Sequence, residues 1–175
     1  MNQTHDPYYI DKHSTQTLQQ GLEEYYALNP HITDPRKLPP EFARILMAHD
    51  VSHVILGCTT NMYDELKLLP LGFWTSDFKF KDYIRVNQDP TIKPAIDTMY
   101  RDLIKEHGVL WLYSSIFLTL PRLLPEVIII WFKTRSRSKF YPFLNYESLL
   151  HRSLLEIRQE FDLLPLLRTL ATKLR

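Results

Sequence analysis

The sequence predicts an all-α fold, a compact single-domain bundle of about seven to eight helices over residues 1–175. Apolar residues recur mostly at intervals of three or four, which is the period of a helix packed on a core. The chain contains twelve Pro and only four Gly, so we expect helices that are separated by proline-containing turns. A length of 175 residues suits one domain and allows a sizeable buried core.

The first half of the chain is expected to form three helices after a flexible arm at residues 1–13. The apolar spacing predicts a helix near Thr15–Leu28, and a turn rich in Pro and Asp follows at Asn29–Pro40. The second helix begins at Pro39-Pro40, because proline is tolerated in a first turn, and ends at a Gly57 C-cap. The third helix is capped by one of three polar residues and ends at a proline and a glycine: Thr59, Thr60 or Asn61 at its start, and Pro70 and Gly72 at its end.

The second half is expected to contain a loop and further helices. Aromatic and charged residues alternate within Phe73–Pro94, and we prefer a loop to a short strand there. Pro94–His107 is amphipathic and is closed by Gly108. The last helical pair is predicted at Tyr146–Phe161 and Leu163–Leu174.

Composition narrows the possible functions. The formal net charge is +1 at pH 7, which gives no global bias toward nucleic acid, so no nucleic-acid partner is expected. The single cysteine, Cys58, excludes an internal disulfide framework and is expected to be a small packed residue rather than a nucleophile. Residues 1–12 lack both the apolar core of a signal peptide and the Arg-rich character of a transit peptide, so we expect a cytoplasmic location.

The most informative motif is His49-Asp50-x-x-His53 followed by Glu65. His49 and His53 lie one turn apart on the same side of the predicted helix, and Asp50 lies on the flank of that face. Glu65 follows the break at Gly57 and is expected to return from the next helix as a third ligand. Two His and one carboxylate are typical of a metal site that keeps an open position.

A polar cluster without a metal is the alternative. Both histidines fall on the predicted buried stripe of the helix, where unpartnered imidazoles carry a large desolvation cost. They must therefore be either metallated or hydrogen-bonded to Asp50 and Glu65. Spacing alone favours neither outcome, because short His/Asp patterns recur by chance.

This motif resembles that of the Coq-four family of coenzyme Q biosynthesis, in which eleven residues separate the second His from the Glu, as here. The resemblance extends from Pro40-Glu41-Phe42 to Gly57, and it returns weakly at three later places: Tyr146, Leu155-Glu156-Ile157-Arg158 and Phe161-Asp162-Leu163. The chain departs from the family at Ser52, where an aromatic residue is usual. This departure affects the expected pocket wall rather than the metal ligands.

The resemblance implies a role in the synthesis of ubiquinone or a related prenylated quinone. It implies a prenylated ring precursor as substrate, whose C1 carboxyl group is replaced by a hydroxyl, and other quinone-biosynthesis enzymes as partners. His49, His53 and Glu65 would bind a divalent metal, with Zn the first choice and Mg, Mn or Fe also acceptable. Asp50, the predicted catalytic residue, would be a fourth ligand or would fix the tautomer of a histidine.

Two other functions remain open from the sequence. The protein is alternatively a non-catalytic scaffold that presents lipid intermediates to other enzymes, with a structural metal. A metal-dependent hydrolase is the second alternative, although Asp50 replaces the Glu that serves as the base of zinc peptidases.

The segment Val109–Phe132 is nearly all apolar but is interrupted by Pro121, Arg122, Pro125 and Glu126. Since no uncharged stretch approaches the roughly 18 residues that a bilayer span requires, we expect no transmembrane helix. Two shorter helices are predicted instead, at about Val109–Leu120 and Arg122–Lys133. They are expected either to lie in the core or to form a lipid-binding groove and peripheral membrane surface, and the leftover apolar area favours a homodimer.

Four cationic residues follow this segment: Lys133, Arg135, Arg137 and Lys139. They are expected either to be solvated or to bind an anionic lipid headgroup or a phosphate.

Overall fold

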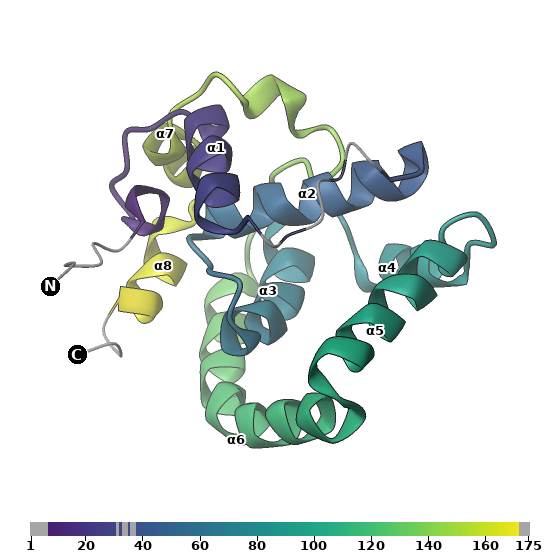
Figure 1. The fold of residues 1–175 in the computed structure, drawn as a ribbon. Helices are drawn as coiled ribbons and strands as arrows, with labels where there is room; N and C mark the ends of the chain where they lie inside the picture. Colours follow the sequence, from purple (N-terminus) through teal and green to yellow (C-terminus); the bar gives the residue numbers. More distant parts are fainter. Residues whose placement is uncertain (1–6, 31, 33–34, 36–37, 172–175) are drawn as a thin grey trace, which may run out of the picture.

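The computed structural model describes residues 7–30, 32, 35 and 38–171, with the side chains of 168–171 left aside. The described residues form helices and no strand, which confirms the predicted all-α single domain (Figure 1). In chain order the elements are η1 (Tyr8–Ile10), α1 (Leu18–Leu28), α2 (Pro40–Leu56), α3 (Met62–Thr75), α4 (Phe80–Gln88), α5 (Lys93–His107), α6 (Val109–Thr134), η3 (Tyr146–Leu149), α7 (Leu154–Glu160) and α8 (Leu164–Ala171).

Helix α2 carries the His-Asp-x-x-His motif and contributes heavily to the core. Its last two turns are almost completely buried, and it packs against α1, α3, α7 and η1. Gly21 allows α1 to approach closely, because a Cβ at this position would lie 2.6 Å from Cγ1 of Val54. The motif is therefore held on a rigid, buried element.

Both ends of α2 and the start of α3 are where the sequence predicts them. Helix α2 begins at Pro40 and ends at Gly57, which has a left-handed conformation with φ of 61°. The side chain of Asn61 accepts a hydrogen bond from the backbone N–H of Asp64 and so caps α3. These two caps fix where α2 ends and α3 begins, and so help to set the position of Glu65 relative to α2.

A buried arginine completes the C-terminal end of α2. The guanidinium of Arg158 donates hydrogen bonds to the carbonyl oxygens of Val54 and Ile55, both at 2.9 Å, and to those of Tyr9 and Asp11. The positive charge satisfies carbonyls that have no partner within the helix. Burial lowers the pKa of Arg158 to about 10.

The same contacts hold the N-terminal segment against the core. Tyr9 is buried, and its backbone N–H donates to Glu24 of α1. The predicted flexible arm therefore does not extend over Tyr8–Ile10, and residues 1–6 of that arm lie outside the described residues.

Two predictions for the middle of the chain are wrong. Helix α3 continues past Pro70 and Gly72 to Thr75, because Leu68 and Leu71 pack into the core on either side of the proline. Helix α4 forms within the predicted loop. Its start is stabilised by the Asp82 carboxylate, which accepts a hydrogen bond from the backbone N–H of Lys79.

The predicted helix over Tyr146–Phe161 is also wrong, since η3 and α7 are separate elements. The chain between them pairs with the start of α1, where the N–H groups of Leu18 and Gln19 donate to the carbonyls of Arg152 and Leu150. Helix α7 then begins at a capping box formed by Ser153 and Glu156.

Helix α6 replaces the two shorter helices predicted for the apolar segment. It is continuous and bends near its middle, where Pro121 and Pro125 lie (Figure 1). By length and composition alone, α6 is long and apolar enough to cross a membrane. The sequence argument against a transmembrane helix assumed that the prolines and charges divide this segment, and they do not.

One narrow stripe of α6 packs against α3, and it consists of Leu123, Glu126, Ile130 and Thr134. The Glu126 carboxylate is buried and accepts a hydrogen bond from the Tyr63 hydroxyl of α3. The acidic residue within the apolar segment is therefore turned toward the protein, and most of the large apolar side chains of α6 are exposed.

Candidate metal centre

Two helices bring His49, His53 and Glu65 together. One ligand atom from each residue lies within 4.8 Å of the other two. Nε2 of His53 lies 3.3 Å from Oε1 of Glu65, and Nε2 of His49 lies 3.6 Å from Oε2. Two ligand atoms about 2.1 Å from a tetrahedral zinc ion lie roughly 3.4 Å apart, so these separations suit ligands that share one ion. The predicted His/His/Glu group is thus present as a candidate metal site.

The two histidines have different environments, contrary to the prediction that both are buried. The His53 side chain is fully buried, while that of His49 is 40% exposed. The ring of Tyr25 stacks on His53 at 5.4 Å between centroids and closes that side. An ion held here would consequently be reached from the His49 side.

The nitrogens of His53 indicate that the residue fits a metal. Neither Nδ1 nor Nε2 makes a hydrogen bond of acceptable geometry with a described residue. A buried imidazole without a well-formed hydrogen bond is costly, and coordination through one nitrogen removes part of that cost. The buried His53 nitrogen and the Glu65 carboxylate that faces it are ligand atoms that suit a divalent cation.

Asp50 lies on the other side of His49 from Glu65. Its Oδ1 is 3.7 Å from Nδ1 of His49, which is longer than a hydrogen bond, and its Oδ2 accepts one of 2.7 Å from the Tyr26 hydroxyl. The three residues whose ligand atoms converge do not include Asp50. Of the two roles predicted for Asp50, the geometry matches the partner of a ligand rather than a fourth ligand.

Charge in the centre favours cation binding. Burial by itself lowers the pKa of His49, but the Asp50 and Glu65 carboxylates outweigh it and raise that pKa above its usual value. Burial by itself raises the pKa of Glu65, but the neighbouring His53 and His49 outweigh it and lower that pKa. Protons and a divalent cation would therefore compete for the imidazole nitrogens of this site.

The first turn of α3 holds Glu65 in place through contacts that were not predicted. The Asp64 carboxylate accepts hydrogen bonds from the backbone and hydroxyl of Thr59 and pairs with the buried Lys67 at 2.7 Å. Lys67 lies over the ring of Tyr63. No signal in the sequence identified Lys67 or Tyr25 as neighbours of the site, because both look like ordinary helix residues.

Cys58 and Ser52 are packed residues. Cys58 is fully buried, as predicted, and burial raises the pKa of its thiol to about 12, which disfavours the thiolate form. The Ser52 hydroxyl is bonded to the Ala48 carbonyl at 2.8 Å and to the Tyr141 hydroxyl at 3.1 Å. Ser52 is therefore a buried residue that contacts Tyr141 in the core.

The four cations after the apolar segment differ from one another. Lys133 donates to the Pro165 carbonyl, and Arg137 donates to the carbonyls of Phe161 and Asp162. Arg135 lies over the rings of Trp131 and Phe132. Lys133, Arg137 and Lys139 line one hollow, and Arg135 does not.

Comparison of the chain with protein-family models, with curated proteins and with solved structures gives no match.

Proposed function

We propose that the protein binds a divalent cation through His49, His53 and Glu65 and uses it to act on a prenylated ring acid in quinone synthesis. The convergence of three ligand atoms from α2 and α3 within 4.8 Å carries this proposal. Zinc is the first candidate, since two imidazoles and one carboxylate form a common three-ligand set for catalytic zinc. Mg, Mn and Fe remain acceptable to the same ligands.

Three protein ligands leave a coordination position for a substrate. A metal in this position polarises a carboxylate or phenolate oxygen and orients the ring that carries it. Asp50 lies behind His49, so we assign it the role of a positioning residue and not the catalytic role predicted from the sequence. Its carboxylate favours a proton on Nδ1 of His49 and leaves Nε2 free to coordinate.

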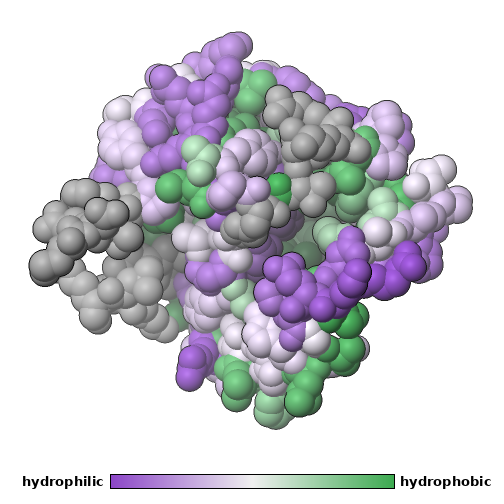
Figure 2. All heavy atoms as spheres, in the orientation of Figure 1, coloured by the Kyte–Doolittle hydropathy of each residue, from purple (hydrophilic) through white to green (hydrophobic). Residues whose placement is uncertain are grey.

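The motif resemblance and the surface of α6 support a substrate with an isoprenoid tail. Helix α6 packs on α3, the helix that carries Glu65, and it exposes large apolar side chains along most of its length. Figure 2 shows apolar side chains gathered at the lower end of the visible face, over α6. An apolar surface on the helix that packs against α3 suits a molecule with a long tail and a charged ring.

The same surface supports peripheral attachment to a membrane. Glu126 is turned inward, and the exposed side of α6 carries these large side chains: Leu110, Trp111, Tyr113, Phe117, Leu118, Leu124, Ile128, Trp131 and Phe132. Burying such side chains in lipid removes apolar area from water. The predicted homodimer and the predicted partner enzymes remain predictions.

The test is conversion of a precursor by the purified, metal-loaded protein. A prenylated 4-hydroxybenzoate is supplied in detergent micelles, and release of CO₂ and the hydroxylated product are followed by mass spectrometry. Replacing a carboxyl by a hydroxyl is a two-electron oxidation, so the assay contains dioxygen, and the balanced reaction consumes one O₂ and one water and releases CO₂ and H₂O₂. Because Zn does not change oxidation state, the protein is loaded in parallel with Fe or Mn. Conversion by the wild type and none by His53→Ala is the expected result.

Other outcomes favour the alternatives. Retention of the precursor without conversion by the metal-loaded protein contradicts the enzymatic role and supports the scaffold. Hydrolysis of generic phosphate esters or peptides supports the metal-dependent hydrolase.

A further inference from the structure

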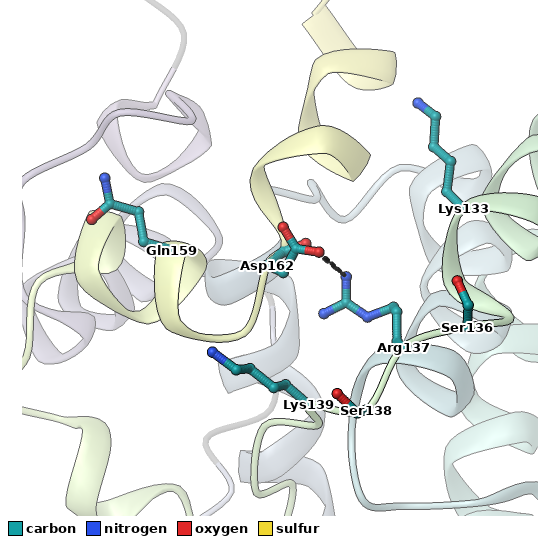
Figure 3. A pocket seen from close by; sticks show the side chains of 7 residues that line it. All are labelled: Lys133, Ser136, Arg137, Ser138, Lys139, Gln159 and Asp162. Atoms are coloured by element: carbon teal, nitrogen blue, oxygen red, sulfur yellow. Dashed lines mark hydrogen bonds and ion pairs between the residues drawn. The ribbon is translucent and has the colours of Figure 1, made fainter.

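A basic hollow lies between the C-terminal end of α6 and the turn that joins α7 to α8. Its volume is about 380 Å³, and Lys133, Arg137 and Lys139 line it. Ser136 and Ser138 lie beside them, and Gln159 and Asp162 come from the opposite side (Figure 3). We refer to this space as the basic hollow. It is formed by two segments that are at least twenty residues apart, so residue spacing does not reveal it.

The charge of the basic hollow is positive. Three cationic side chains face one carboxylate, that of Asp162, whose Oδ2 lies 4.0 Å from a terminal nitrogen of Arg137. Among the described residues that line the hollow, positive charges outnumber negative charges by two, whereas the whole chain has a formal net charge of +1. The positive potential is a local feature that does not follow from the overall composition.

Arg137 is a fixed part of this hollow. Its side chain is only 6% exposed, and its terminal nitrogens donate to the carbonyls of Phe161 and Asp162 at the end of α7. Its Nε is buried and has no hydrogen-bond partner among the described residues. A cation held in this way is preorganised, and it retains one donor that no described residue uses.

The neutral groups of the hollow are also donors. Ser136 and Ser138 supply hydroxyls, and Gln159 supplies an amide. Donors that surround a space from several directions match an anion with three or four acceptor oxygens better than they match a planar carboxylate. We propose that the basic hollow binds a phosphate group, carried either by a lipid headgroup or by a soluble phosphate.

The four cations that the sequence singled out do not all belong to the basic hollow. Arg135 is excluded, because its guanidinium lies 5.1 Å from the centroid of the Phe132 ring and does not line the hollow. Lys139 is exposed and is therefore the best position to substitute without disturbing the fold. Lys133 is a poorer choice, since its Nζ donates to the Pro165 carbonyl at the start of α8.

The experiment compares Lys139→Gln with the matched control Arg135→Gln, which removes the same charge from the same segment. Inorganic phosphate is titrated into the full-length proteins by calorimetry at constant ionic strength. Loss of one charge-assisted hydrogen bond weakens binding on the order of tenfold in Lys139→Gln. Arg135→Gln is expected to bind like the wild type. Ser138→Ala, which removes a hydroxyl without a change in charge, is expected to weaken binding by a smaller factor.

Vesicles distinguish the two sources of phosphate. Phosphatidylcholine vesicles with and without phosphatidic acid are mixed with each protein and sedimented. If Lys139→Gln loses the preference for phosphatidic acid and Arg135→Gln keeps it, the phosphate belongs to a lipid headgroup. If only the titration with inorganic phosphate separates the two variants, the phosphate is soluble.

Two results overturn the proposal. One is equal weakening by Lys139→Gln and Arg135→Gln, which indicates unspecific attraction between charges. The other is absence of phosphate binding by the wild type in both assays. The basic hollow is independent of the metal centre, so His53→Ala must leave phosphate binding unchanged whether or not the proposed metal chemistry is correct.

Discussion

At the scale of single residues, His53 is the side chain whose surroundings most require a partner. It is fully buried, stacks on Tyr25 and faces Glu65, yet its nitrogens make no acceptable hydrogen bond with the described residues. His49 is more exposed and is flanked by two carboxylates. The two imidazoles therefore contribute differently to the candidate metal site: His53 is its buried ligand, and His49 lies on the side that faces solvent.

We expect His53→Ala to abolish metal binding, because the buried ligand is lost and only His49 and Glu65 remain in the group of converging ligands. Asp50→Asn is expected to lower metal affinity by about 10- to 100-fold, as is usual for partners of metal ligands. Elemental analysis of the purified proteins measures both effects. His107→Ala on α5, where His107 stacks on Trp111, serves as the control. Full metal occupancy in a His49→Ala/His53→Ala double variant would contradict the site.

Metal affinity is expected to fall as the pH is lowered from about 8 to about 6, because protons compete for the imidazole nitrogens. The raised pKa of His49 places the start of this competition at a higher pH than that of an ordinary histidine. Asp50→Asn removes a charge that raises this pKa, so its affinity curve should shift toward lower pH. Zinc titration at a series of pH values checks both statements. An identical pH dependence in the two proteins would show that Asp50 does not act on His49.

At the scale of secondary-structure elements, caps and long-range contacts together determine how α2 meets α3. Gly57 ends α2 in a left-handed conformation, and Arg158 holds the carbonyls just before it. Asn61 then starts α3, four residues before Glu65. A change at this junction would alter the distance between the imidazoles and Glu65.

Gly57→Ala is expected to destabilise the fold by about 1–2 kcal/mol, because a Cβ is unfavourable in the left-handed conformation. The added Cβ would also lie 3.2 Å from the Ile10 carbonyl oxygen. Gly72→Ala is a matched control within α3, where a Cβ meets nothing within 4 Å, and it should stabilise by about 0.5–1 kcal/mol. Urea unfolding measures both. Equal stability of the two variants would show that the Gly57 conformation carries no strain.

At the scale of the whole molecule, α6 is notable because it exposes many large apolar side chains to solvent. Four of its residues form a buried stripe against α3, while large apolar side chains on its other sides face solvent. An exposed apolar area of this kind usually marks contact with a partner or a membrane. The bend near Pro121 and Pro125 turns the first half of the helix away from the direction of the second (Figure 1).

Replacing Leu110 and Phe117 by Ser is expected to lower binding to phospholipid vesicles by on the order of tenfold or more, since both side chains would lose apolar burial in lipid. They are 83% and 74% exposed, so the fold should be retained. Leu28→Ser, at an exposed position of α1, is the control. Vesicle sedimentation and size-exclusion chromatography are the measurements. Unchanged vesicle binding combined with conversion of a dimer to a monomer would assign this surface to a second copy of the chain.

Local interactions made part of this protein predictable from its sequence. Proline at a first turn, glycine at a C-cap and asparagine at an N-cap act within a few residues, so the start and end of α2 and the start of α3 follow from the sequence. The spacing of His49 and His53 follows from helix geometry. The approach of Glu65 was predicted from the short connection between the two helices, and its ligand atoms do converge with those of the histidines.

Only the tertiary structure decided the features that depend on residues far apart in the chain. Helix α6 continues through its prolines while its buried stripe packs on α3, and Glu126 faces inward because Tyr63 meets it there. Arg137 and Arg135 look equivalent in the sequence, yet Arg137 is fixed by two carbonyls that directly follow α7 and Arg135 lies over aromatic rings. Such contacts depend on which surfaces meet after folding, and neither residue spacing nor local propensity specifies that.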